Sequence, residues 1–198
     1  MGLFPLALAG LVGLAADPPP KKLPAELAPL RESLQHTVAL SARFEQTKHL
    51  KALQDVLVTT GKLSYRRGGE FRWHTDPPAE SDLLLQGATA TLMLPGMSSA
   101  QTFDLSSAPG MGKVFETLRA VLEADLDRLT PLFDLEIIRT RPLSVSLKSR
   151  TAALARALAS IRLDFDARFR LLSVSLSEPD GDRTEITFRD HVIETSGQ

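Results

Sequence analysis

The sequence contains no cysteine among its 198 residues, so it has no disulfide, no thiolate metal ligand and no cysteine nucleophile. The same absence excludes N-terminal lipidation through a cysteine. Aromatic residues are few, with one tryptophan and one tyrosine beside nine phenylalanines. Neither charge is in clear excess, because 23 basic and 24 acidic side chains leave a net charge of -1. This balance does not favour a polyanion-binding surface, and we expect no nucleic-acid partner.

Motifs for catalysis and cofactor binding are lacking as well. Residues 110–113 approach a phosphate-binding loop, but Ser107 replaces its first glycine and Val114 replaces its hydroxyl residue. Residues 96–100 lack the last glycine of a nucleophile elbow. The four histidines do not have zinc spacing, and the carboxylates around Asp180 do not have calcium-loop spacing. We therefore expect a protein that is not an enzyme, with no cofactor and no metal site.

The first sixteen residues are almost continuously apolar and carry no charged side chain. This run is shorter than the roughly 20 residues of a permanent transmembrane helix, and the small residues Ala15 and Ala16 end it. We interpret residues 1–16 as a secretory signal peptide and residues 17–24 as a proline-rich spacer. A buried N-terminal helix is the alternative. The remaining residues, 25–198, are expected to form a single soluble domain.

Hydrophobic periodicity separates the expected helices from the expected strands. Apolar residues recur at spacings of three and four over residues 25–36, which predicts an amphipathic helix. Two more helices are expected over residues 114–122 and 126–133. Alternation with a period of two predicts strands over residues 38–44, 56–65, 70–74, 81–86, 89–94, 135–140, 143–148, 161–165, 172–176 and 186–188. The order of these elements predicts an α+β domain with a long antiparallel sheet.

The most informative segment is GKLSYRRGGEFRWHTDPP, residues 61–78. Leu63 and Tyr65 share one face of a strand, and Phe71 and Trp73 share one face of the next strand. Spacing alone favours an ordinary hydrophobic core here, because apolar periodicity reports burial and not ligand binding.

The same segment resembles a strand pair of the LolA-type lipoprotein carriers, in which a glycine opens the strand, basic residues precede the turn and F-x-W follows. ALSARFEQT, residues 39–47, is similar to the aromatic-x-F-x-Q strand that follows the first helix of this family. Residues 77–87 and 164–190 resemble its P-to-G segment and its closing hairpins. Order and spacing agree over most of residues 25–190.

This resemblance implies an α+β fold with a strongly curved antiparallel β-sheet, an unclosed β-barrel whose concave, apolar side is covered by helices. Residues 25–198 would form one carrier domain. The implied function is a periplasmic carrier that shields acyl chains of lipoproteins and moves them from the inner to the outer membrane. The implied partners are an acylated lipoprotein or other lipid cargo, a releasing transporter in the inner membrane and an outer-membrane acceptor. We expect a monomer that contacts membranes only transiently.

The resemblance also assigns site residues. Arg67 stands at the position of the family's lid arginine, which bonds backbone carbonyls of the lid helices and holds the empty cavity closed. A surface arginine at a strand end is the alternative for Arg67. The residues expected to line the lipid cavity are Leu30, Leu34, Leu40, Phe44, Leu63, Tyr65, Phe71, Trp73, Leu83, Leu85, Leu92 and Leu94.

Three departures from the family pattern leave the cargo open. Residues 86–94, QGATATLML, lack the usual aromatic residue, and Gly68 stands where the family commonly has proline. The segment beyond Phe188 is short. A carrier of a non-protein envelope lipid or glycolipid is therefore the alternative function. A lipid-sensing or protein-interaction module with the same fold is the alternative from another class.

Overall fold

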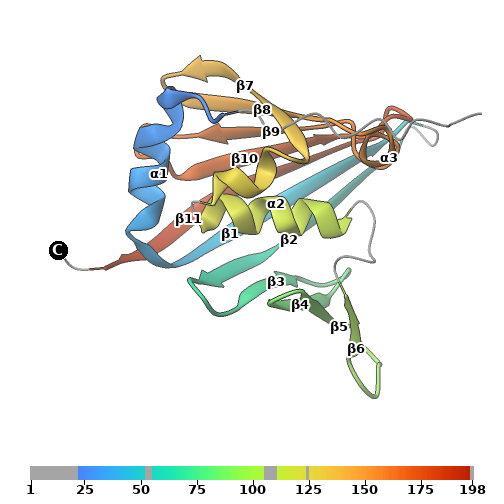
Figure 1. The fold of residues 1–198 in the computed structure, drawn as a ribbon. Coiled ribbons are helices and arrows are strands. Elements are labelled where there is room, and N and C mark those ends of the chain that lie inside the picture. Colours follow the sequence, from blue (N-terminus) through green and yellow to red (C-terminus); the bar gives the residue numbers. More distant parts are fainter. Residues whose placement is uncertain (1–21, 52–54, 105–110, 124, 197–198) are drawn as a thin grey trace, which may run out of the picture.

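The computed structural model describes residues 22–51, 55–104, 111–123 and 125–196 (Figure 1). The predicted signal peptide and the first five residues of the predicted spacer, residues 17–21, lie outside the described residues. Among the described residues, no helix has the length and apolar character to cross a membrane.

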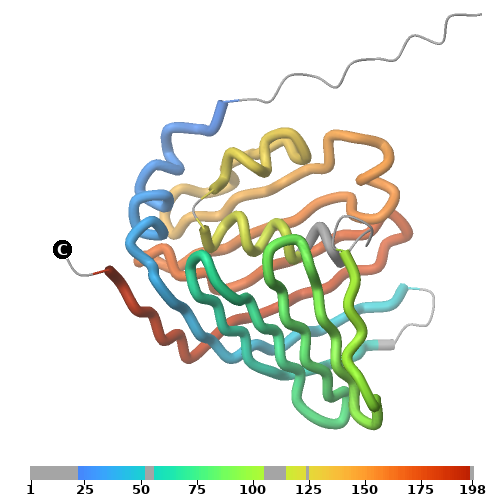
Figure 2. The backbone as a smooth tube through the Cα atoms, turned by 60° about the horizontal axis from the view of Figure 1, so that its bottom comes forward, coloured from blue at the N-terminus to red at the C-terminus, as the bar shows by residue number. Residues whose placement is uncertain are grey.

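One antiparallel sheet dominates the fold, with the strand order β6-β5-β4-β3-β2-β1-β11-β10-β9-β8-β7. The strands are β1 (Thr37–Leu50), β2 (Asp55–Arg66), β3 (Phe71–Thr75), β4 (Ser81–Gln86), β5 (Thr89–Met93), β6 (Gln101–Asp104), β7 (Phe133–Thr140), β8 (Leu143–Ser149), β9 (Ser160–Phe165), β10 (Leu171–Ser177) and β11 (Arg183–Thr195). The pairing of β1 with β11 joins an N-terminal wing, β1 to β6, to a C-terminal wing, β7 to β11. The sheet is curved (Figure 2). It does not close, because the outer strands β6 and β7 do not pair with each other.

The helical elements lie at the two ends of the strands and on the concave side of this sheet (Figure 1). They are η1 (Ala25–Leu27), α1 (Ala28–Gln35), α2 (Met111–Leu122), η3 (Leu126–Leu129) and α3 (Ala152–Ala155). In Figure 1, α2 runs along the concave side in front of β1 and β11, while α1 crosses the ends of the strands. The curved, unclosed sheet with helices over its concave side confirms the predicted fold class.

The helix predicted over residues 126–133 is wrong. Leu126–Leu129 form only a short 3-10 turn, and Phe133 already begins β7. Pro131 lacks the N–H that a continuing helix would need, which explains the early end. Two short elements, β6 and α3, were not predicted at all.

The alternation predicted for residues 172–176 is also wrong at its first position. Leu171 is buried, whereas Leu172 is 40% exposed. The pairing of β10 with β9 shifts register between Leu171 and Ser173. Such a β-bulge adds one residue to a strand and reverses the side chain alternation beyond it.

Candidate functional site

Two rows of side chains that are paired across strands form the concave wall of the N-terminal wing. The first row consists of Leu40, Tyr65, Phe71, Leu85 and Ala90. The second row consists of Ala42, Leu63, Trp73, Leu83 and Leu92. Leu40 and Leu92 are partly buried, and the other members of both rows are buried. We call these two rows the wall.

Phe44 extends the wall at the next position of β1. Its ring stacks on Trp73 with a centroid distance of 4.0 Å. Gly61, the strand partner of Phe44, leaves room for this stack, because a Cβ at Gly61 would lie 2.5 Å from the Phe44 ring. The same Cβ would lie 2.0 Å from the backbone oxygen of His74. Glycine at position 61 therefore permits the aromatic packing of the wall.

Helix α2 covers the wall with its apolar face. Phe115 makes edge contacts with Phe71 at 5.8 Å and with Trp73 at 5.9 Å between ring centroids. Leu118 and Val121 are each 1% exposed and belong to the same core cluster. The concave face is thus filled by side chains of α2 in the structure.

The predicted cavity residues lie together in this core, with one exception. Leu30 and Leu34 reach it from α1, and the predicted residues of β1 to β5 belong to the wall or pack beside it. Leu94 lies beyond the end of β5 and is 41% exposed. The structure does not bring Leu94 into the cluster. The α2 residues that cover the wall were not among the predicted site residues, although their helical spacing was recognised.

Arg67 lies directly after β2, where the carboxyl ends of α1 and α2 meet. Its guanidinium donates hydrogen bonds to three backbone oxygens: Nη2 to Leu34 at 2.6 Å, Nε to Thr37 at 2.9 Å and Nη1 to Glu123 at 3.1 Å. The last carbonyls of a helix have no partner within the helix and carry a partial negative charge, so a cation is favoured there. Arg67 therefore connects the turn after β2 to both helices. We call Arg67 and these three carbonyls the latch.

A second set of charges ties α2 to the turn between β4 and β5. Arg119 donates to the backbone oxygen of Gly87 and, at 2.9 Å, to the Glu123 carboxylate. Arg128 lies 3.4 Å from the other Glu123 oxygen. Glu123 thus accepts a hydrogen bond from Arg67 with its backbone oxygen and one from Arg119 with its carboxylate.

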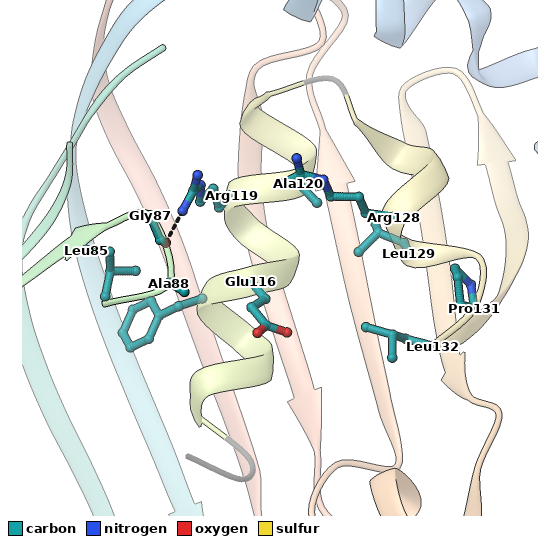
Figure 3. A pocket seen from close by; sticks show the side chains of 11 residues that line it. Leu85, Gly87, Ala88, Glu116, Arg119, Ala120, Arg128, Leu129, Pro131 and Leu132 are labelled. Atoms are coloured by element: carbon teal, nitrogen blue, oxygen red, sulfur yellow. Dashed lines mark hydrogen bonds between the residues drawn. The ribbon is translucent and has the colours of Figure 1, made fainter. Parts of the chain in front are cut away.

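A cavity of about 620 Å³ opens beside this charged cluster (Figure 3). Leu85 and Phe115 line one side of the cavity, and Leu129 and Leu132 line the other. Arg119, Arg128 and Glu116 supply its polar atoms. The cavity therefore lies between the wall, α2 and the residues that lead into β7, where the sheet is not closed.

The acidic residues of the last hairpin come together at its turn. One carboxylate oxygen each from Glu178, Asp180 and Asp182 lies within 4.8 Å of the others. Lys48 approaches Glu178 at 3.4 Å, and the backbone N–H of Lys51 donates to Asp182 at 3.0 Å. These contacts are typical of a turn, where short acidic side chains accept hydrogen bonds from nearby backbone N–H groups.

Comparison with known families gives one match over most of the chain. The model of the family described as "Outer membrane lipoprotein carrier protein LolA" matches residues 35–196. The matched region begins at the end of α1 and includes all the described strands, α2, Arg67 and the latch carbonyls of Thr37 and Glu123, whereas Leu34 lies just before it.

Curated relatives carry the same description at low identity. The outer-membrane lipoprotein carrier protein of Pseudomonas fluorescens is 27% identical over 110 residues, which are 56% of this chain and 51% of the relative. The one of Azotobacter vinelandii is 27% identical over 135 residues, 68% of this chain and 62% of the relative. The matched regions thus span only about half to three fifths of the length of these relatives.

Solved structures with a similar arrangement include a LolA superfamily protein from Nitrosomonas europaea, with a TM-score of 0.44 and 10% identity. That match covers 87% of this chain and 93% of the other. The lipoprotein LppX of Mycobacterium tuberculosis aligns with a TM-score of 0.46 and 10% identity, over 87% of this chain and 97% of the other.

Proposed function

The chain belongs to the LolA family of outer membrane lipoprotein carrier proteins, and we propose that it carries acyl chains of lipoproteins across the periplasm between α2 and the wall. The family consists of carriers and not of enzymes. The observation that carries this proposal is the latch, which fastens two helices over an apolar concave face through one side chain.

Exchange between α2 and an acyl chain is the core of the proposed mechanism. Fully burying a leucine or phenylalanine contributes about 1.5–3 kcal/mol, and burying one methylene of an acyl chain contributes about 0.8 kcal/mol. An acyl chain on the wall would replace contacts of Phe115, Leu118 and Val121 with contacts of the same kind. The two states are then similar in free energy, so that cargo can be both loaded and released.

The latch would favour the closed state, and therefore release of the cargo, in this exchange. Opening the lid separates the Arg67 guanidinium from the Glu123 carbonyl, and a hydrogen bond of a charged donor contributes about 1.5–3 kcal/mol. A guanidinium keeps its charge at all relevant pH values, so the cost of opening cannot be relieved by deprotonation. Closure of the latch would therefore help expel the cargo at an acceptor.

The route and partners complete the proposal. A releasing transporter at the inner membrane would load the carrier, and an acceptor at the outer membrane would take the acyl chains from it. The predicted signal peptide and the periplasmic location of the family support this route. The carrier is proposed to act as a monomer that touches the membranes only during transfer.

A displacement assay tests the proposal. The secreted protein should bind an apolar fluorophore, and a diacylated peptide should displace it. Phe71→Glu places a charge on the wall and should abolish loading, whereas Lys62→Glu, on an exposed position of β2, should leave it unchanged. Circular dichroism checks that both variants are folded. If Phe71→Glu still loads, or if no acylated ligand displaces the fluorophore, the proposed site is wrong.

Native mass spectrometry of protein isolated from its own periplasm identifies the cargo. Co-purifying lipoprotein supports the proposal. A non-protein envelope lipid or glycolipid would keep the carrier role and change its cargo. A stable stoichiometric protein complex without lipid would favour an interaction module instead.

A further inference from the structure

The hydroxyl group of Tyr65 is a polar group buried within the apolar wall. Tyr65 is 4% exposed, and none of the described residues forms a hydrogen bond with its hydroxyl oxygen. A buried hydroxyl without a partner destabilises the state in which it occurs. Phenylalanine would supply the same ring without this cost, so the hydroxyl is unfavourable in the closed, empty protein.

Tyr65 lies near the end of β2, two residues before Arg67 of the latch. Burial raises the pKa of Tyr65, and the charges of Arg67, Glu123 and Arg119 also act on it. At neutral pH the group is therefore an O–H donor. Tyr65 pairs across the strands with Phe71, and Phe71 pairs with Leu85, which lines the cavity of about 620 Å³. Tyr65 thus belongs to the row of the wall that leads to this cavity.

We propose that the Tyr65 hydroxyl is the donor of a subsite for the carbonyl oxygen that links an acyl chain to its headgroup. The inference rests on the proposed function and specifies the chemical linkage of its cargo. A chain that lies along Phe71 and Trp73 would have its first carbonyl beside Tyr65. Its headgroup would then lie toward Arg119 and the open cavity (Figure 3). In the loaded state the hydroxyl gains the partner that it lacks in the empty state.

This subsite would make binding depend on the chemical linkage of the chain and not only on its length. Ester and amide carbonyls accept hydrogen bonds well, whereas an ether-linked chain of equal length offers no carbonyl. The apolar wall binds both kinds of chain through the same contacts. The protein should therefore prefer acyl chains over alkyl ether chains.

Two matched probes and one variant test the inference. The probes are a cysteinyl peptide with two palmitoyl ester chains on its glyceryl group and the same peptide with two hexadecyl ether chains. Tyr65→Phe should weaken binding of the diester about tenfold, the effect of one neutral hydrogen bond, and should leave binding of the diether unchanged. Phe71→Leu, which alters apolar contacts of the wall and of Phe115 but removes no polar group, should weaken binding of both probes to a similar degree.

The outcomes separate this inference from the proposed function. Equal weakening of both probes in Tyr65→Phe, or no weakening of either, would overturn the carbonyl subsite. Thermal unfolding gives a second check, because removing an unpartnered hydroxyl should not lower the unfolding temperature of the empty protein. A clear decrease would mean that the hydroxyl has a partner in the empty state and would also overturn the subsite. If the unmodified protein binds neither probe, the proposed carrier function fails instead.

Discussion

A single side chain, Arg67, links three separate parts of the chain. Its planar guanidinium offers five donors in a fixed arrangement, and three of its hydrogen bonds reach backbone oxygens at Leu34, Thr37 and Glu123. Lysine has the same charge but concentrates its donors on one nitrogen. The geometry of the latch therefore depends on arginine and not merely on a positive charge.

Arg67→Lys should loosen the closed state. We expect the free energy of unfolding to fall by about 1–3 kcal/mol, because at least one charged hydrogen bond is lost. An apolar fluorophore should bind more tightly, since closure of the lid competes with it less. Thermal unfolding and fluorophore titration measure the two effects. Arg66→Lys is the matched control, because Arg66 is exposed and its nearest carboxylate, that of Glu194, lies 3.5 Å away. Equal behaviour of the two variants would contradict the latch.

At the scale of elements, α2 is the part of the chain that competes with cargo in the proposed mechanism. Its face contributes Phe115, Leu118 and Val121 to the core, and its carboxyl end is held by Arg67. The segment that contains α2 connects β6 to β7, the two strands at the free edges of the sheet. A helix attached at both edges can move away from the wall without disturbing any strand pairing.

The only tryptophan of the chain should report this movement. Trp73 lies 5.9 Å from Phe115 of α2 and 4.0 Å from Phe44 of the wall, as ring centroid distances. Displacement of α2 by an acyl chain changes the environment of Trp73, so its emission should shift as a diacylated peptide is added. The titration midpoint should agree with that of fluorophore displacement. An emission spectrum that stays constant at saturation would show that α2 remains on the wall.

At the scale of the whole molecule, ionised carboxylates fasten strands and turns around the apolar core. A hydrogen bond from the Thr60 hydroxyl lowers the pKa of Asp76, and Arg43 assists at 2.6 Å. A hydrogen bond from Arg72 lowers the pKa of Asp82 in the next strand. These groups join β1, β2, β3 and β4 on the outer side of the sheet.

These shifts predict the direction of the pH dependence. A carboxyl group whose pKa is lower in the folded state stabilises the fold above its unfolded pKa, which is about 3.9 for aspartate. That stabilisation is lost as the pH falls through the lowered value. The unfolding temperature should thus change little between pH 7 and pH 5 in response to these groups and should decrease below about pH 4. Asp82→Asn should lower the unfolding temperature at pH 7 and reduce its dependence on acid. Calorimetry at several pH values measures both, and an unfolding temperature that stays constant down to pH 3 would contradict the assignment.

The sequence by itself determined the nature of most elements and the apolar faces of the wall. Period-two alternation at Leu63, Tyr65, Phe71 and Trp73 placed the correct side chains together, because strand geometry is local. Two predictions from periodicity were wrong. Residues 126–133 do not form a helix, because the turn ends before Pro131, and Leu172 is exposed, because a β-bulge shifts the alternation of β10.

Only the tertiary structure decided what faces the wall and which backbone carbonyls Arg67 reaches. The partners of Arg67 lie 30, 33 and 56 residues away in sequence, and no spacing rule connects them. The same holds for Phe115, whose helical spacing predicted a buried face but not the aromatic side chains that it covers. Periodicity describes which side of an element is apolar, whereas the packing of α2 on the wall and the hydrogen bonds of Arg67 depend on how distant elements meet in space.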